Sequence, residues 1–167
     1  MRVQDLAILA LFPLCLSAVP AWGANCTDPA GPGVDWERCY FDNKELAGHI
    51  LTHSHLVDAS FQRTDLSKSD LSNANGYRVK FISARLPEAK LEAGNFAEAD
   101  FTKADLSGAN MRNADFRRAR FFKAILRKSD LTGARTQGAD FTAADLSGAI
   151  WTDGHHICAE GSLGQCN

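Results

Sequence analysis

The residues best suited to chemistry in this 167-residue chain are its histidines and cysteines, five of each. The histidines form two sequence groups, the first with His49, His53 and His55 and the second with His155 and His156. Imidazole suits Zn²⁺ and Cu²⁺, so a metal site deserves consideration. His49, however, falls at an inward position of the repeat described below, and Cys158 is better used in a disulfide. We therefore expect structural histidines and no bound metal.

A recurrent aspartate is the other potential source of chemistry. It precedes many of the large apolar residues, at repeat positions expected to point outward. Asp side chains at such positions bond to nearby backbone groups in turns. The chain contains no glycine-rich phosphate loop and no nucleophile elbow, and it offers no helix for a zinc-protease motif. We expect neither enzymatic activity nor a cofactor.

The first 23 residues predict a secretory signal peptide. Arg2 precedes the apolar run from Leu6 to Leu16, and small residues allow cleavage after Gly23. The run is shorter than the ~20 residues that cross a bilayer, so we expect no membrane span after cleavage. Four cysteines remain, and four cysteines in an exported chain predict two disulfides in one of three connectivities. Their clustering near the two ends favours Cys26–Cys39 and Cys158–Cys166.

The composition describes one soluble globular domain. The chain is 45% hydrophobic and 23% charged, with a formal net charge of −2. These values exclude a disordered or collagen-like chain and give no general attraction to nucleic acid.

Between the two cysteine pairs the sequence repeats every five residues. Of 24 steps from Trp36 to Trp151, only Gly76 and Thr136 are not large and apolar, and a small residue usually stands two positions earlier. The phrase Ala-Asp-Leu-Ser-Gly recurs at 104–108 and 144–148. A five-residue step fits neither the 3.6-residue period of a helix nor the two-residue period of a strand. The chain must therefore turn a corner at every repeat.

A second period of 20 residues relates four repeats to one another. One row of apolar centres is all Phe (Phe41, Phe61, Phe81, Phe101, Phe121, Phe141) and the next is all Leu (Leu46, Leu66, Leu86, Leu106, Leu126, Leu146). Residues 20 apart should therefore stack, so that four pentapeptides complete one coil. This register predicts that Phe101 and Leu106 are buried and that Asp100 and Ser107 are exposed.

Charges alternate along the outward rows, which supports the same register, as cross-strand pairs do in sheets. The expected ladders are Asp65–Arg85–Asp105, Lys68–Glu88, Asp70–Lys90, Glu92–Arg112, Glu98–Arg118, Asp100–Arg120–Asp140 and Asp115–Arg135.

Residues 34–153 resemble a pentapeptide-repeat protein. The resemblance implies an all-β fold, a right-handed quadrilateral parallel β-helix of about six coils, in which the apolar centre and the small residue two before it point inward. The flanking residues 24–33 and 154–167 then form N-terminal and C-terminal caps, because open solenoid ends would pair with further strands. Gly76 and Thr136 depart from the pattern, and we expect an irregular backbone near Asn75–Arg78.

The family resemblance also implies a possible function, since some members are DNA mimics that bind DNA gyrase and protect or inhibit it. That function requires a strongly acidic face and a cytoplasmic address. Here acids alternate with bases and the N-terminus predicts export. We favour an exported, non-enzymatic scaffold or protein-binding module of the bacterial envelope, periplasmic or secreted, and keep gyrase binding as the alternative.

One surface stands out as a candidate partner patch. It combines bases that lack an acid one coil away with apolar residues at outward positions: Lys103, Arg117, Phe122, Lys123, Ile125, Arg127 and Lys128. Apolar residues rimmed by unpaired bases are typical of interfaces. An acidic protein or an anionic envelope glycan would suit this patch. The sequence leaves open whether the chain is a monomer or a dimer.

Overall fold

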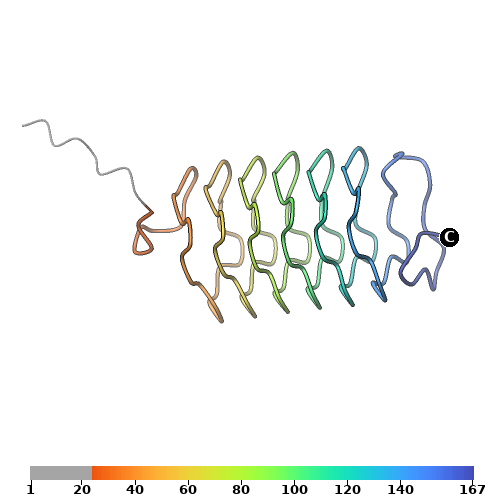
Figure 1. The fold of residues 1–167 in the computed structure, drawn as a ribbon, viewed down its shortest axis with the longest axis horizontal. Coiled ribbons are helices and arrows are strands. Elements are labelled where there is room, and N and C mark those ends of the chain that lie inside the picture. The colour runs from red at the N-terminus through yellow and green to blue at the C-terminus, as the bar shows by residue number, and fades with distance from the viewer. Residues whose placement is uncertain (1–23) are drawn as a thin grey trace, which may run out of the picture.

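The chain winds into a stack of similar coils, which runs along the long axis of the molecule (Figure 1). A computed structural model describes residues 24–167, so the expected signal peptide lies outside the described residues. Within residues 24–167 there is no helix and no extended strand, only isolated β-bridges, at every fifth residue from Asp35 to Ile150 and at Ile157 and Leu163. Parallel bridges link residues 20 apart in four rows, which begin at Asp35↔His55, Tyr40↔Ser60, Glu45↔Asp65 and Ile50↔Asp70. The expected 20-residue register is therefore present in the backbone.

Each pentapeptide forms its backbone hydrogen bonds within the stack. Around Phe101, the N–H of Phe101 donates to Arg120 O at 2.7 Å, and the N–H of Lys103 donates to Phe122 O at 2.9 Å. The N–H of Ala104 closes the turn by bonding to Phe101 O at 2.9 Å. The third residue of this turn has a positive φ, as in a type II turn. Eighteen non-glycine residues of the described chain adopt that conformation, with φ between 55° and 60°.

The recurrent aspartate supplies an acceptor for the amide two residues later. Asp100 Oδ1 accepts the backbone N–H of Thr102 at 2.9 Å, and Asp105 accepts that of Ser107 at 3.0 Å. Ser107 also donates its hydroxyl to Asp105 at 2.6 Å. These bonds confirm that the aspartates bond to the local backbone. They also hold the side chains of Asp100 and Ser107 close to the coil. Both residues are half-buried, whereas the register predicted that they are exposed.

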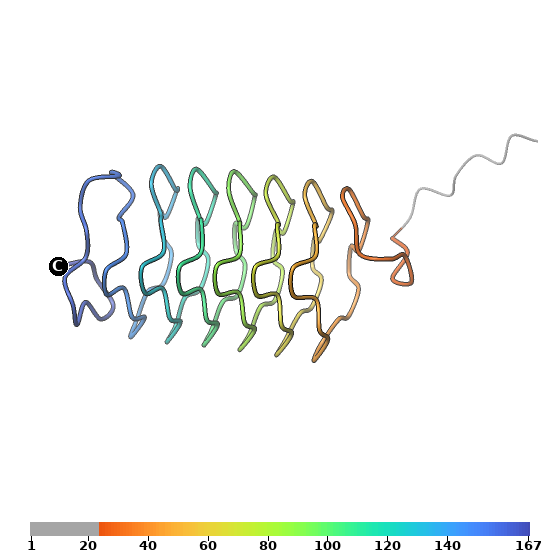
Figure 2. The same cartoon turned by 180° about the vertical axis from the view of Figure 1, so that it is seen from behind.

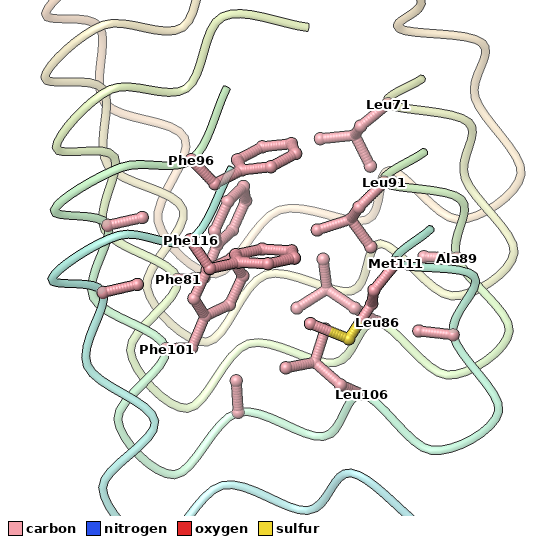
Figure 3. Close-up of a cluster of buried hydrophobic side chains, with 14 of the residues drawn as sticks. Leu71, Phe81, Leu86, Ala89, Leu91, Phe96, Phe101, Leu106, Met111 and Phe116 are labelled. Carbon is pink, nitrogen blue, oxygen red and sulfur yellow. The ribbon is translucent and has the colours of Figure 1, made fainter. Parts of the chain in front are cut away.

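The interior is a continuous apolar column (Figure 3). Phe101 and Leu106 are fully buried, as expected. Figure 3 shows the phenylalanines gathered on one side of the column and the leucines with Met111 on the other. Phe101 and Phe121 stack with ring centroids 4.9 Å apart, close to the ~4.8 Å spacing of neighbouring strands. Burial of such a side chain contributes about 1.5–3 kcal/mol before entropy.

The row that contains Gly76 is regular, so the expected irregularity near Asn75–Arg78 is wrong. Asn75 keeps its bridge to Asn95. The ring of Phe96 occupies the space that a side chain at Gly76 would need, because a Cβ there would lie 2.7 Å from Phe96 Cδ1. Gly94 also faces this ring. The absence of side chains at these two glycines thus leaves room for the large ring of Phe96.

The two ends of the stack differ. The C-terminal segment lies antiparallel across the last coil, with bridges Ile150↔Ile157 and Asp145↔Leu163. Residues 24–33 lie beyond the first coil at the other end, and Trp36 Nε1 donates to Asp28 O at 3.3 Å (Figures 1 and 2). Disulfides join Cys26 to Cys39 and Cys158 to Cys166, the favoured pairing.

The prediction that His49 points inward is wrong. This residue is exposed, and its Nδ1 lies 3.3 Å from Ala47 O. The imidazole is larger than the Ala and Ser side chains that occupy the same repeat position deeper in the stack, such as Ser69 and Ala89. Among residues 24–167, no three His, Cys, Asp or Glu side chains are placed to hold a metal ion. No helix in this part of the chain is long and apolar enough to cross a membrane.

Candidate partner-binding surface

Ion pairs between neighbouring coils follow several of the expected ladders. Arg85–Asp65, Lys90–Asp70 and Arg118–Glu98 approach within 3.4–3.6 Å, and Lys68–Glu88 and Arg120–Asp100 within 3.8–3.9 Å. The basic side chains are exposed and most of the carboxylates are half-buried, and surface pairs of this kind contribute about 0–1 kcal/mol each. Their main consequence is that most bases on these faces already have an acidic partner.

Arg112 pairs differently from its prediction. Its guanidinium bonds to Asp130 at 2.9 Å, and Glu92, the expected partner, accepts a hydrogen bond from the Asn110 side chain instead. A long arginine side chain can reach a carboxylate 18 residues away as easily as one directly above or below it.

Two bases of the expected patch, Arg117 and Arg127, are paired with acids. Arg117 bonds to Asp115 at 2.7 Å, and Arg127 bonds to Asp145 at 2.5 Å and lies 3.5 Å from Glu160. Hydrogen bonding to Asp115 raises the pKa of Arg117, and hydrogen bonding to Asp145 raises that of Arg127. Both guanidiniums are therefore engaged within the chain and are poor candidates for contacting a partner.

The structure also places Arg117 apart from the rest of the patch. It lines a shallow surface hollow of about 290 Å³ with Tyr77, Glu98, Arg118 and Gln137. The hollow runs across stacked coils, along the corner one pentapeptide before the corner that carries Phe122. Glu98 accepts a bond from the Tyr77 hydroxyl at 3.1 Å and pairs with Arg118, so its charge is already balanced.

Lys103, Lys123 and Lys128 make no ion pair with any residue in 24–167. The backbone bond from Lys103 to Phe122 places Lys103 directly beside the turn that carries Lys123. Lys123 Nζ lies 5.2 Å from the centre of the Phe122 ring, a cation–π contact that leaves the ammonium solvated. Lys128 packs its stem against Gly148.

The apolar part of the patch is smaller than expected. Phe122 is half-buried, and Ile125 is 40% exposed. Ile125 is bridged to Asp105 on one side and to Asp145 on the other. We call Lys103, Phe122, Lys123, Ile125 and Lys128 the lysine patch.

Comparison with known proteins decides the family. A family model described as pentapeptide repeats, in eight copies, matches residues 54–92, 95–133 and 124–150, more than half of the chain. The chain belongs to the pentapeptide repeat family. Proteins of this family with known structures form right-handed β-helices, which agrees with the bridge register. No curated protein sequence gives a significant match.

Solved pentapeptide repeat structures resemble this one. A trypsin-treated variant of QnrB1, a plasmid-mediated fluoroquinolone resistance protein, is 24% identical with a TM-score of 0.53, over 72% of this chain and 62% of that one. The present chain thus spans less than two thirds of that structure. A protein from the Arabidopsis thaliana thylakoid lumen is 25% identical with a TM-score of 0.43, over 74% and 83% of the two chains. HetL, involved in heterocyst differentiation regulation in the cyanobacterium Nostoc sp., is 21% identical with a TM-score of 0.30, over 74% and 91%.

Proposed function

We propose that this pentapeptide repeat protein is an exported, non-enzymatic binding module of the bacterial envelope. The observation that carries the proposal is the pair of disulfides, Cys26–Cys39 at one end of the stack and Cys158–Cys166 at the other. Disulfides persist in oxidising compartments outside the cytoplasm. Residues 1–23 then act as the signal peptide and residues 24–33 and 154–167 as caps.

The finer architecture belongs to the same proposal. Four rows of bridges, at residues 35, 40, 45 and 50 and their successors up to Ile150, support a four-sided helix of about six coils. Apolar side chains fill its interior, so that a ligand has only the outer faces to bind. A rigid column with such faces suits a scaffold, in keeping with the extended binding surfaces of other solenoids.

We assign contact with an anionic partner to the lysine patch. Its three ammonium groups are not neutralised by described neighbours, whereas the arginines nearby are held by Asp115 and Asp145. The overall charge of −2 gives no broad attraction to polyanions. An acidic protein or an envelope glycan therefore fits a local patch better than nucleic acid does.

Gyrase binding through DNA mimicry remains the alternative function. A DNA mimic needs a run of unpaired carboxylates along one face, as the phosphates of DNA provide. In this chain Asp65, Asp70, Glu98 and Asp100 each lie within 3.9 Å of a base in the next coil. These ion pairs favour the envelope proposal.

The test is to locate the native protein by cell fractionation and to determine its N-terminus and thiol state by mass spectrometry. The proposal predicts a periplasmic or secreted chain that begins near Ala24 and carries both disulfides. A cytoplasmic chain with free thiols that binds purified gyrase would establish the alternative and refute export.

A further inference from the structure

The first coil presents an open backbone edge at one end of the stack. In the second coil the N–H groups of Ser60, Asp65 and Asp70 donate to carbonyls of the first coil at 2.8–2.9 Å. The equivalent residues of the first coil are Tyr40, Glu45 and Ile50. Their N–H groups find no acceptor, and their carbonyls no donor, among residues 24–167. Within the described residues only the fourth side is covered, where the N–H of Asn25 bonds to Asp35 O at 3.1 Å.

Large apolar side chains accompany this edge. Tyr40 is 79% exposed and Ile50 is 57% exposed. Phe41 and Leu46 are only partly buried, whereas Phe61 and Leu66 one coil further in are fully buried. Exposed apolar side chains beside unpaired strand groups form a template for pairing with another chain.

The opposite end of the stack is closed by the chain itself. Leu146 donates to Ser162 O at 2.9 Å, and Gly148 donates to Cys158 O at 2.8 Å. The antiparallel bridge between Ile150 and Ile157 lies on this end. The C-terminal cap therefore prevents head-to-tail stacking of copies, and it shows that an antiparallel segment can close a coil of this helix.

The spacing of the free groups determines what can pair with them. Tyr40, Glu45 and Ile50 offer one donor and one acceptor each, five residues apart, on three successive sides of a coil. A straight strand can follow one side only. A second pentapeptide coil has donors and acceptors at the same five-residue spacing on every side. Another copy of this chain provides such a coil, because its own N-terminal edge is open as well.

Charge on the first coil permits such self-association. The acids Asp35, Glu37, Asp42 and Glu45 outnumber the bases Arg38 and Lys44 by two, which is a small net charge for a whole coil. Two right-handed coils that meet at their N-terminal ends run antiparallel, as the C-terminal cap does. We propose that two copies of this protein pair end to end about a two-fold axis, through the edge formed by Tyr40, Glu45 and Ile50. The contact lies at a different part of the stack from the lysine patch, so either can fail without the other.

Analytical ultracentrifugation of the purified protein, with its N-terminus determined by mass spectrometry, tests the proposal. The expected result is a concentration-dependent dimer, weakened about tenfold or more by Ile50→Lys, since a buried charge at an interface costs heavily. Ile157→Lys is the matched control, because Ile157 is 64% exposed on the capped end. It should leave the dimer intact.

Amide hydrogen exchange provides a second readout that does not depend on a variant. The amides of Tyr40, Glu45 and Ile50 should exchange more slowly at concentrations where the dimer forms than where the monomer predominates. The proposal is overturned if wild type stays monomeric at its highest soluble concentration, if Ile157→Lys and not Ile50→Lys breaks the dimer, or if the three amides exchange at one rate throughout.

Discussion

The carboxylate of Asp115 is shared by Arg117 and Arg135, whose guanidiniums approach its Oδ2 at 2.7 and 2.8 Å. Asp115 also accepts the backbone N–H of Arg117 at 3.1 Å. The Asp115 side chain is only 5% exposed. The carboxylate that these two arginines share is therefore buried in the packed coil.

Neutralising Asp115 should lower stability and change its pH dependence. Hydrogen bonding by Arg117 lowers the pKa of Asp115 below its ordinary value of 3.8. A lowered pKa in the folded state stabilises the fold above pH 3.8, and this contribution is lost as the pH falls further. Asp115→Asn should therefore cost about 1–3 kcal/mol at neutral pH and flatten the decline in stability below pH 4. Urea unfolding at pH 7 and pH 3 measures both effects. A variant that loses as much stability at pH 3 as at pH 7 contradicts the assignment.

Two serines at the same repeat position should respond oppositely to removal of the hydroxyl. Ser69 Oγ donates to Leu66 O at 2.7 Å, whereas Ser54 Oγ is buried without a partner among the described residues. Ser69→Ala should destabilise by about 1 kcal/mol, and Ser54→Ala should be neutral or stabilising by about 1 kcal/mol. Thermal unfolding of the two variants decides the matter, and equal losses would argue against the hydrogen-bond assignment.

The space around Phe96 predicts a compensating pair of substitutions. Gly76→Ala forces a methyl group against the Phe96 ring and should cost about 1–3 kcal/mol. In the background of Phe96→Leu, which vacates part of that space, the same change should cost markedly less. A double-mutant cycle from chemical denaturation measures the coupling between the two sites. Additive losses would show that the ring does not fill the glycine space.

Each disulfide should stabilise its end of the stack. Cys26–Cys39 and Cys158–Cys166 close short loops, with sequence separations of 13 and 8, for which loop entropy gives about 3 kcal/mol each. Replacing both cysteines of a pair by Ser should lower stability by up to this amount and increase exchange first in the adjacent coil. Amide exchange in the reduced and oxidised protein tests this. Uniform loosening of all coils would contradict an end-specific role.

The fold could be predicted because the types of residue alone reveal both its five-residue and its 20-residue period. The Phe row and the Leu row identify stacked positions, and both Phe101 and Leu106 lie where that register puts them. The first coil was not predictable in the same way. His49 has an inward repeat position, but the period does not reveal that a coil at the end of the stack tolerates a large exposed residue there.

The candidate surface was predicted only in part, for a geometric reason. Counting acids exactly one coil away misses Asp115, which lies two residues before Arg117, and Asp145, which lies 18 residues after Arg127. Arginine side chains are long enough to reach both. Among residues 24–167 no acid forms an ion pair with the three lysines of the patch, whereas the two arginines of the expected patch are paired.

Retention on an immobilised anionic polymer tests the binding account most directly. Wild type, Lys103→Glu/Lys123→Glu and the control Lys80→Glu/Lys90→Glu would be eluted from heparin and from an isolated envelope fraction with a salt gradient. The two double variants change the net charge equally, and circular dichroism and thermal unfolding would verify their folds. We predict that only the patch variant elutes at clearly lower salt than wild type, because screened contacts between a local patch and its partner depend on those two lysines. If both variants elute alike, or if wild type is not retained, the lysine patch is not a partner-binding surface.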